Sequence, residues 1–224
     1  ERNTKWVNLN QIPEDLKNAV IATEDKRFEE HHGVDWNRTA YAVLNLFFHM
    51  SSGKAGGSTI TQQLIKNVTG NNEVSIERKL KEIFQALNLE KEYSKDEILE
   101  YYLNIIPLGN GAYGVQAAAE TYFNKDVSEL SLLECAAIAG ITQNPSRYNP
   151  IYNPKNNKQR RQDVLYNMYD QEIISESQYN AVKNQELVLD TSSIATSSAT
   201  ATVDWYTDLV REDVIRDLMK QRGL

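Results

Sequence analysis

Helical periodicity runs through most of the chain and limits the folds that it can adopt. Residues 75–93 carry large apolar side chains at the spacing of one helix face, namely Leu80, Ile83, Phe84 and Leu87. Residues 94–104 begin with Ser94 and Glu97, the pair that closes a capping box at a helix start. The sequence shows neither an alternation of strands and helices nor an internal repeat. It therefore predicts a mainly α fold.

Composition and charge narrow the range of functions. The chain has 224 residues, 41% of them hydrophobic and 25% charged, which is ordinary for a globular protein with a sizeable core. The net charge of −7 argues against a nucleic-acid partner held by a broad positive surface. An anion bound by this chain must therefore be met by a local cluster of Lys and Arg.

The cysteine content and the apolar segments narrow the choice further. Cys135 is the single cysteine, which excludes an internal disulfide and a cysteine-based zinc site, and its apolar helical setting predicts a packed thiol rather than a nucleophile. No stretch reaches the roughly 18 apolar residues that span a bilayer. At the end of the shorter apolar segment 41–50, Phe47 and Phe48 can dip into a membrane surface, but an ordinary buried helix end explains them equally well.

A helix that leads to Glu24 carries the first candidate for chemistry. It starts with Pro13 in its first turn, and Leu16 and Val20 form an apolar stripe with Glu24 at its edge. A partly desolvated carboxylate suits a general base. A helix-end Glu or a buried ion pair is the structural alternative, and the residue type alone does not decide between them.

The segment GGSTITQQLIKN, residues 56–67, predicts a ligand site at a helix start. Gly56 and Gly57 allow a close approach of the backbone, and Ser58 is expected to cap the helix that follows. The exposed N–H groups suit a phosphate or a sugar oxygen. The polar side chains predicted on one side of this helix contain no carboxylate: Thr59, Gln62, Gln63 and Lys66. A solvated polar face is the alternative.

Arg78 and Glu82 stand four residues apart on the next helix. A surface salt bridge, worth about 0.3 to 0.5 kcal/mol, is the default interpretation. In a functional interpretation Arg78 and Lys66 hold a pyrophosphate, while Glu82 orients the cations or a bound metal ion. Glu82 facing Glu24 across a cleft would also resemble the paired carboxylates of glycoside chemistry.

Two other patterns carry little weight. GNGAYG, residues 109–114, matches a dinucleotide-binding pattern, but no strand and no βαβ unit surrounds it. His31, His32 and His49 lack metal-ligand spacing, and His31 is expected to pack or to form hydrogen bonds near Glu24.

Taken together, the segments resemble the ordered motifs of family 51 glycosyltransferases, the peptidoglycan polymerases of class A penicillin-binding proteins. The order and the spacing agree from about residue 6 to residue 187. The matching segments are EDKRFEEHHG (24–33), GGSTITQQLIKN (56–67), RKLKE (78–82), KDEILEYYLN (95–104) and RRQDVLYNM (160–168).

This resemblance implies a lysozyme-like helical fold with a large globular lobe and a smaller jaw lobe that faces the membrane. The glycosyltransferase domain would cover residues 1–187, with the jaw at about 36–56, and residues 188–224 would form a linker toward a transpeptidase domain. The implied location is the outer face of the bacterial cytoplasmic membrane.

The resemblance also implies the chemistry. The donor would be a glycan on undecaprenyl pyrophosphate and the acceptor lipid II. Glu24 would be the general base, Glu82 the second essential carboxylate, and Lys66 and Arg78 would stabilise the leaving pyrophosphate. No cofactor is required, although Mg²⁺ or Mn²⁺ near the pyrophosphate fits the chemistry, and no nucleic acid is expected.

Other motif positions take roles by the same resemblance. Substrate contacts are expected from Ser58, Gln62, Gln63 and Lys79. The sequence departs from some relatives at Val74, where they carry a basic residue, so phosphate binding would depend more on Lys66, Arg78, Lys79 and Lys81. Structural roles are expected for Asp25, Phe28, His31, Gly33, Gly57, Thr59, Asn67, Glu100 and Asn104.

Two rival functions remain compatible with the residues. A lysozyme-like muramidase would share the fold and the paired acids, and would release short saccharides from finished glycan. A non-catalytic helical scaffold would bind the cell-wall precursor without converting it.

Overall fold

The structure is a computed structural model of the chain, and it describes residues 3–41, 57–70, 73, 75–192, 212–214 and 216. Helices dominate these residues, which confirms the predicted mainly α fold. The helices are α1 (Glu14–Glu24), α3 (Ile60–Thr69), α4 (Ile76–Glu92), α5 (Lys95–Ile105), α6 (Val115–Phe123), α7 (Leu132–Ile141), α8 (Pro154–Asp170) and α9 (Glu176–Val182).

Short 3-10 helices and one small sheet complete these elements. The 3-10 helices cover Leu9–Gln11 and Val127–Glu129. Strand β1 (Asn3–Thr4) pairs in parallel with β2 (Ala112–Tyr113), so the start of the chain lies beside the turn that precedes α6.

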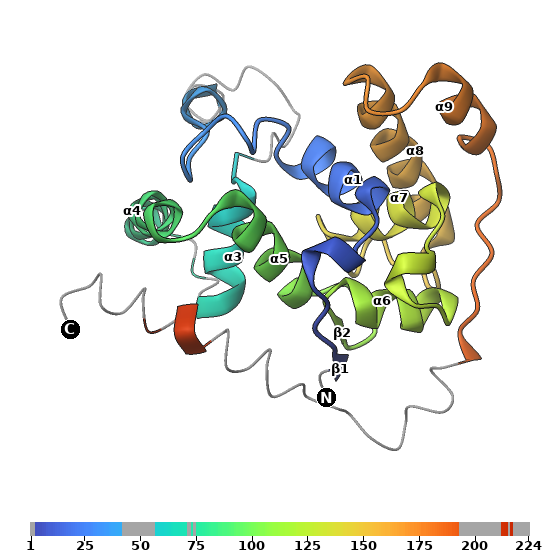
Figure 1. Ribbon diagram of the computed structural model, residues 1–224, viewed down its shortest axis with the longest axis horizontal. Coiled ribbons are helices and arrows are strands. Elements are labelled where there is room, and N and C mark those ends of the chain that lie inside the picture. The colour runs from blue at the N-terminus through green and yellow to red at the C-terminus, as the bar shows by residue number, and fades with distance from the viewer. Residues whose placement is uncertain are drawn as a thin grey trace.

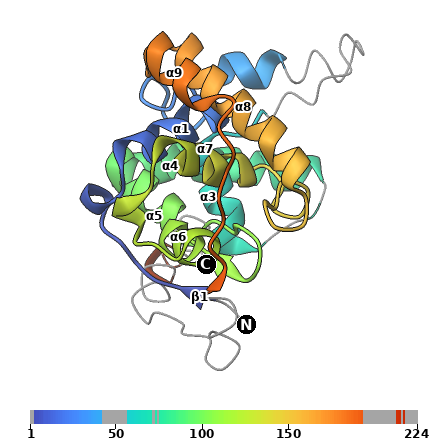
Figure 2. The same cartoon turned by 90° about the vertical axis from the view of Figure 1, so that its right-hand side faces the viewer.

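The helices form two packed groups that meet at the end of α1 (Figure 1). In one group α7 packs against α1 and α8, and in the other α3 packs against α4 and α5. Because α1 also packs against α8, the three helices α1, α7 and α8 form one mutually packed cluster (Figure 2). Most of α7 is buried, including Cys135, whose burial raises the pKa of its thiol. The prediction of a packed thiol is confirmed.

Side-chain caps explain where most of the helices begin. The side chains of the N-cap residues accept a hydrogen bond from the backbone N–H two or three residues ahead, which satisfies a donor that the helix leaves unpaired. For α3 the cap is Thr59, not Ser58 as expected, because Thr59 forms a reciprocal capping box with Gln62. The other helices with such a cap begin after Ser75, Ser94, Ser131 and Ser175.

The apolar face of α4 is only partly where the sequence predicted it, because Ile83 and Leu87 are half-buried against the core while Leu80 and Phe84 are not. Leu80 and Phe84 are 51% and 64% exposed in the described part of the chain. The buried face of α4 instead carries Glu82 and Gln85 beside Ala86 and Leu89. The periodicity correctly predicted a helix and part of its inward face, but Glu82, which was expected to point away from the apolar stripe, is buried in its ion pairs.

Some of the remaining sequence predictions concern residues that the structure describes, and others concern residues outside them. The 109–114 segment forms a turn into β2, and a Cβ at Gly114 would lie 2.3 Å from the carbonyl oxygen of Asn104, so this glycine serves close packing. None of the described helices is long and apolar enough to cross a bilayer. Most of the expected jaw, with Phe47 and Phe48, and most of the expected linker lie outside the described residues.

Candidate functional site

Glu24, the last residue of α1, brings side chains from distant parts of the chain together. Its side chain is 10% exposed. One carboxylate oxygen accepts a hydrogen bond from Gln63 Nε2 at 2.9 Å, and the other accepts one from Thr142 Oγ1 at 2.8 Å. Arg160 Nη2 lies 3.8 Å from that second oxygen. The carboxylate is therefore held by α3, α8 and the residue that follows α7, and a small part of the side chain stays exposed.

Tyr102 fixes the amide of Gln63 in the orientation that Glu24 needs. The Tyr102 hydroxyl donates to Gln63 Oε1 at 3.0 Å, so the amide nitrogen points to Glu24. Complete burial, with Glu24 and Asp25 nearby, raises the pKa of Tyr102 well above its usual value. The hydroxyl therefore stays protonated, and remains a donor, throughout the physiological range.

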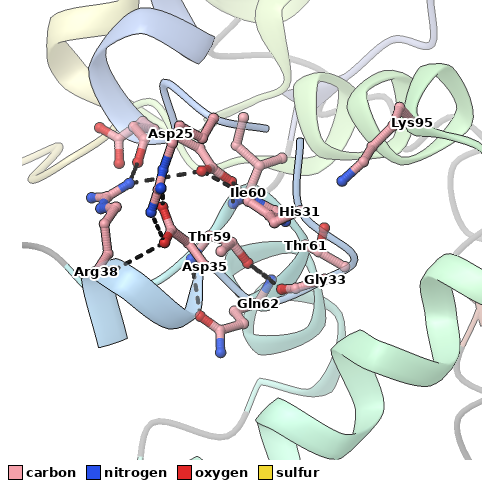
Figure 3. A network of polar contacts seen from close by, with 12 residues as sticks. Asp25, His31, Gly33, Asp35, Arg38, Thr59, Ile60, Thr61, Gln62 and Lys95 are labelled. Carbon is pink, nitrogen blue, oxygen red and sulfur yellow. Dashed lines mark hydrogen bonds and ion pairs between the residues drawn. The ribbon is translucent and has the colours of Figure 1, made fainter. Parts of the chain in front are cut away.

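Asp25 joins the end of α1 to the start of α3 (Figure 3). Its buried carboxylate accepts a hydrogen bond from the backbone N–H of Ile60 at 3.0 Å. His31 Nε2 lies 2.9 and 3.0 Å from its two oxygens, and Arg38 Nη1 lies 3.8 Å away. Arg38 also donates to the backbone oxygen of Glu24 at 2.7 Å. A carboxylate at a helix N-terminus is stabilised by the helix dipole, which favours the contact between Asp25 and the start of α3. Because Glu24 precedes Asp25 in the chain, this contact also keeps Glu24 beside α3.

Gly33 and Thr59 hold the same joint against α4. The Thr59 hydroxyl donates to the Gly33 carbonyl oxygen at 2.7 Å (Figure 3). Gly33 has a φ of 80°, and a Cβ there would lie 2.4 Å from the Ala86 carbonyl oxygen, so both the conformation and the space require glycine.

Gln62 has a different environment from the expected substrate contact. Its side-chain oxygen accepts from the backbone N–H of Thr59 at 2.9 Å, and the residue is fully buried. Gln62 therefore caps α3 from within the protein. The polar side of α3 is consequently not one open face, because Thr59 and Gln62 are buried while Gln63 is half-buried and Lys66 is exposed.

A second cluster lies in the first turns of α4. Glu82, only 4% exposed, forms ion pairs with both Arg78 and Lys79. Lys79 Nζ also donates to Ser58 Oγ at 2.8 Å, which ties the cluster to the residues just before α3. The pair of Arg78 and Glu82 is thus not the surface salt bridge of the default interpretation. Glu82 holds two cations in place beside α3.

Lys66 lies on α3, and in the sequence it comes after Glu24 and before the Arg78, Lys79 and Glu82 cluster of α4. It follows Gln63 by three residues, so the two side chains are neighbours on the helix surface. No partner for its ammonium group is found in the part of the chain that the structure describes. The structure therefore places a free cation on the helix that contacts Glu24, and this helix packs against α4 with its two paired cations.

The fourth motif fastens the start of the chain to α5. Glu100 accepts from Trp6 Nε1 at 3.3 Å and from the Leu9 backbone at 2.7 Å. The Asn104 side chain exchanges hydrogen bonds with the backbone of Val7 at 2.8 and 2.9 Å. These contacts are structural. Three other motif residues have varied burial: Phe28 is buried edge-on to the His31 ring, and Gly57 and Asn67 are half-buried.

Sequence reasoning missed three residues of the site. Thr142 lies in a proline-containing loop, where no periodicity signals a role, and it is 118 residues from Glu24 in the chain. Tyr102 and Arg160 lie inside the fourth and fifth matching segments, which is the signal that could have found them. Among the described residues no group of three or more His, Cys, Asp or Glu side chains converges as metal ligands.

The comparisons with known proteins identify the family of the chain. The family model described as Transglycosylase matches residues 1–169. Penicillin-binding protein 1F of Bacillus subtilis (strain 168) is 44% identical over 209 residues, covering 93% of this chain and 29% of the relative. Penicillin-binding protein 1A of Clostridium perfringens (strain 13 / Type A) is 43% identical over 225 residues, covering 95% of this chain and 33% of the relative.

A solved structure supports the same relationship. The crystal structure of penicillin-binding protein 1A from Haemophilus influenzae superposes with a TM-score of 0.53 at 28% identity, covering 96% of this chain and 22% of that one. The chain thus spans about a third or less of the relatives that it matches. The lysozyme-like helical fold implied by the motifs agrees with this match. The chain belongs to the transglycosylase family, the family 51 glycosyltransferases of class A penicillin-binding proteins, and it is a glycosyltransferase of peptidoglycan synthesis.

Proposed function

We propose that this domain polymerises lipid II into β-1,4-linked glycan, with inversion at the anomeric carbon of the donor MurNAc and release of undecaprenyl pyrophosphate. Glu24 takes the proton from the 4-hydroxyl of the acceptor GlcNAc, and that oxygen attacks the anomeric carbon. The observation that carries this assignment is that α3 contacts both parts of the site. Gln63 of α3 donates to the Glu24 carboxylate, and α3 packs against α4, whose Lys79 contacts Ser58 just before α3.

The hydrogen bonds to Glu24 suit a general base. Gln63 and Thr142 each donate to one oxygen, which fixes the carboxylate in a single orientation. Each oxygen keeps further lone-pair capacity, so either can accept a hydrogen bond from the acceptor hydroxyl. A base of this kind contributes roughly 10²- to 10⁴-fold to a rate when it is held within hydrogen-bond reach of the proton.

The charge of the leaving pyrophosphate gives the basic side chains of α3 and α4 a role in the reaction. Cleavage of a glycosyl–pyrophosphate bond develops negative charge on the departing phosphates, and fixed positive charges lower that barrier. Lys66, Arg78 and Lys79 supply this charge, and Glu82 keeps the latter two in place. In the proposed reaction these three side chains supply the positive charge that the protein itself provides. A Mg²⁺ or Mn²⁺ ion bound with the pyrophosphate would increase that positive charge.

The arrangement around Glu82 favours transfer over hydrolysis of finished glycan. A muramidase must protonate a poor alkoxide leaving group and uses a second carboxyl group near the bond. Glu82 is ion-paired with Arg78 and Lys79 and does not offer a free acid. Pyrophosphate leaves as a stabilised anion, so one base is sufficient.

The names of the relatives suggest the wider setting. We place the full-length protein on the outer face of the bacterial cytoplasmic membrane, where lipid-linked precursor is available. A transpeptidase domain that crosslinks the glycan would accompany this domain in the longer chain. The growing lipid-linked glycan and the membrane surface would then be the partners of this site.

Two incubations test the proposed reaction against its rivals. The purified chain with lipid II and detergent should yield long glycan, and the same chain with finished glycan should release no short saccharides. Lys66→Ala should reduce polymerisation because it removes a free cation. Saccharide release from finished glycan would instead establish a hydrolase, and equal results for wild type and Lys66→Ala would favour a binding scaffold.

A further inference from the structure

A cavity of about 300 Å³ lies between the first turns of α8 and the segment 186–189 that follows α9. This volume is at the lower end of the range for small-molecule sites. Its apolar wall includes Pro154, Leu187 and Leu189, and its polar wall includes Lys155, Lys158 and Arg161. None of these residues has a part in the proposed glycosyl transfer.

Arg161 gives the cavity a buried cation with unused donors. The residue is 2% exposed, and its Nη2 donates to the Gln185 carbonyl oxygen at 3.2 Å. Its Nε has no partner among the described residues. Burial lowers the pKa of Arg161, but a guanidinium remains charged at neutral pH. A buried charge of this kind is costly unless an anion or a set of acceptors satisfies it.

Asn157 adds a second unsatisfied group on the same wall. It is 1% exposed, and its Nδ2 donates to the carbonyl oxygens of Tyr148 at 2.9 Å and Ala137 at 3.4 Å. Its Oδ1 has no partner in the described part of the chain. This oxygen has almost no accessible surface, so Asn157 closes the wall four residues before Arg161 on α8, and the anion-binding donors of the wall come from the basic side chains.

The charge around the cavity is positive although the chain carries a net −7. Lys155, Lys158 and Arg161 face one lining carboxylate, Glu186, which is 2.6 Å from Lys158 Nζ. The N-terminus of α8 adds partial positive charge, and no described side chain caps it. Glu186 also attracts Arg161, so this one carboxylate is shared by Lys158 and Arg161, and Lys155 has no carboxylate partner among the described residues. The charged side chains of the lining therefore keep a net positive charge.

We propose that this cavity binds a small organic anion, with a carboxylate or phosphate head at Arg161 and Lys155 and a short apolar body against Leu187 and Leu189. A planar guanidinium pairs well with either head group. The site is separate from the one at Glu24. Arg160 and Arg161 are successive residues of α8, which places them about 100° apart around the helix. Arg160 faces Glu24, whereas Arg161 faces the segment after α9.

A bound anion would also hold that segment onto the domain. Gln162 Nε2 donates to the Lys183 carbonyl oxygen at 3.1 Å, and Arg161 donates to that of Gln185. The segment then continues beside α8 toward α6, where the Asp190 backbone N–H donates to the Tyr122 carbonyl oxygen at 3.0 Å (Figure 2). A ligand in contact with both α8 and residues 186–189 adds a further link between them.

An NMR titration of the chain with hexanoate and with hexyl phosphate tests the proposal, with neutral hexanamide as the matched control. We expect saturable shifts of the Leu187 and Leu189 methyl groups with at least one anion, and binding about tenfold weaker or more for hexanamide. Preference for one anion identifies the head group. Equal binding of hexanamide and both anions, or no saturation with either anion, would overturn the proposal.

Two variants locate the head group. Lys155→Gln removes a lining charge and should weaken binding of the anion several-fold, while Lys91→Gln removes an exposed charge of α4, outside the cavity lining, and should leave it unchanged. Arg161→Gln should abolish binding, provided that its thermal unfolding stays cooperative. If Arg161→Gln does not fold, the Lys155 result decides, and equal affinities for Lys155→Gln and Lys91→Gln would contradict the assignment.

Discussion

The hydrogen bonds to Glu24 come from two side chains that hold it differently. Gln63 is oriented by Tyr102, whereas the Thr142 hydroxyl lies 2.8 Å from both Glu24 Oε1 and the Ala139 carbonyl oxygen. A hydroxyl has one proton to donate, so Thr142 can donate to an ionised Glu24 or, once Glu24 is protonated, donate to Ala139 and accept from Glu24. Thr142 is therefore a positioning residue suited to both protonation states of the base.

Replacement of Thr142 tests this role. Thr142→Val keeps the shape but removes the hydroxyl, and we expect kcat to fall about 10- to 100-fold, in line with the loss of one hydrogen bond to a charged group. Thr142→Ser should restore most of the activity, which a purely steric role would not predict. Steady-state kinetics with lipid II measures the effect, and a Val variant as active as wild type would contradict it.

Glu82 differs from Glu24 in its partners, so its replacement should have a different kinetic signature. Glu82→Gln releases Arg78 and Lys79 from their fixed positions, and we expect kcat to fall by about 10²-fold because the leaving pyrophosphate is less well stabilised. The acidic limb of the pH profile of kcat/KM should stay where it is, since Glu24 is retained. A displaced acidic limb would show that Glu82 itself transfers a proton.

At the scale of elements, the site depends on the joint between α1, α3 and α4. Gly33 lies at this joint with a positive φ and no room for a side chain, because the backbone of α4 lies where its Cβ would be. Asp25 holds the same joint by accepting from the first N–H of α3. Small displacements here move Gln63, and with it the orientation of Glu24.

Two glycines provide a matched comparison at this scale. Gly33→Ala should lower the free energy of unfolding by about 2 to 4 kcal/mol, since it combines a left-handed backbone with a steric clash. Gly70 has a φ of 64°, and nothing lies within 4 Å of a Cβ added there. Gly70→Ala should therefore lower the free energy of unfolding by only about 1 kcal/mol, because only the backbone conformation is unfavourable. Urea unfolding measures both, and equal losses would contradict the packing of Gly33 on α4.

The elements also show what sequence could predict. Helix existence followed from periodicity and caps, and Glu24 lies at the edge of the buried Leu16 and Val20 stripe as expected. The inward face of α4 was predicted only in part: Ile83 and Leu87 pack against the core as expected, but the burial of Glu82 was missed, because periodicity measures apolar content and does not reveal its ion pairs. Thr142 could not be predicted, since its contact with Glu24 exists only after α1 and α7 have packed together.

At the scale of the whole molecule, buried carboxylates link stability to pH. Burial by itself would raise the pKa of Asp35, but the backbone N–H of Arg38 and the ion pair with Arg27 outweigh it and lower this pKa below 3.8. Burial is likewise outweighed at Glu134, where Lys125 and Ser131 lower the pKa below 4.5. Both groups bind protons more weakly in the folded state than in the unfolded state.

The sign of the pH dependence follows from this difference. The contribution of these carboxylates to stability is complete above their unfolded pKa values and is lost as the pH falls through the lower folded values. We therefore expect the free energy of unfolding to fall steadily from about pH 5 toward pH 3. Asp35→Asn should reduce this slope, and Glu29→Gln, an exposed control, should not. An unchanged slope in Asp35→Asn would contradict the assignment.

The measurement that tests the proposed mechanism most directly is the rate of lipid II polymerisation by Glu24→Gln, with Glu29→Gln as the control on an exposed carboxylate. The amide keeps the size of the side chain but cannot accept the proton, so the rate should fall at least about 10²-fold while thermal unfolding remains cooperative. Glu29→Gln should polymerise like wild type. A folded Glu24→Gln variant that polymerises lipid II at a rate close to wild type would contradict the role of Glu24 as the base.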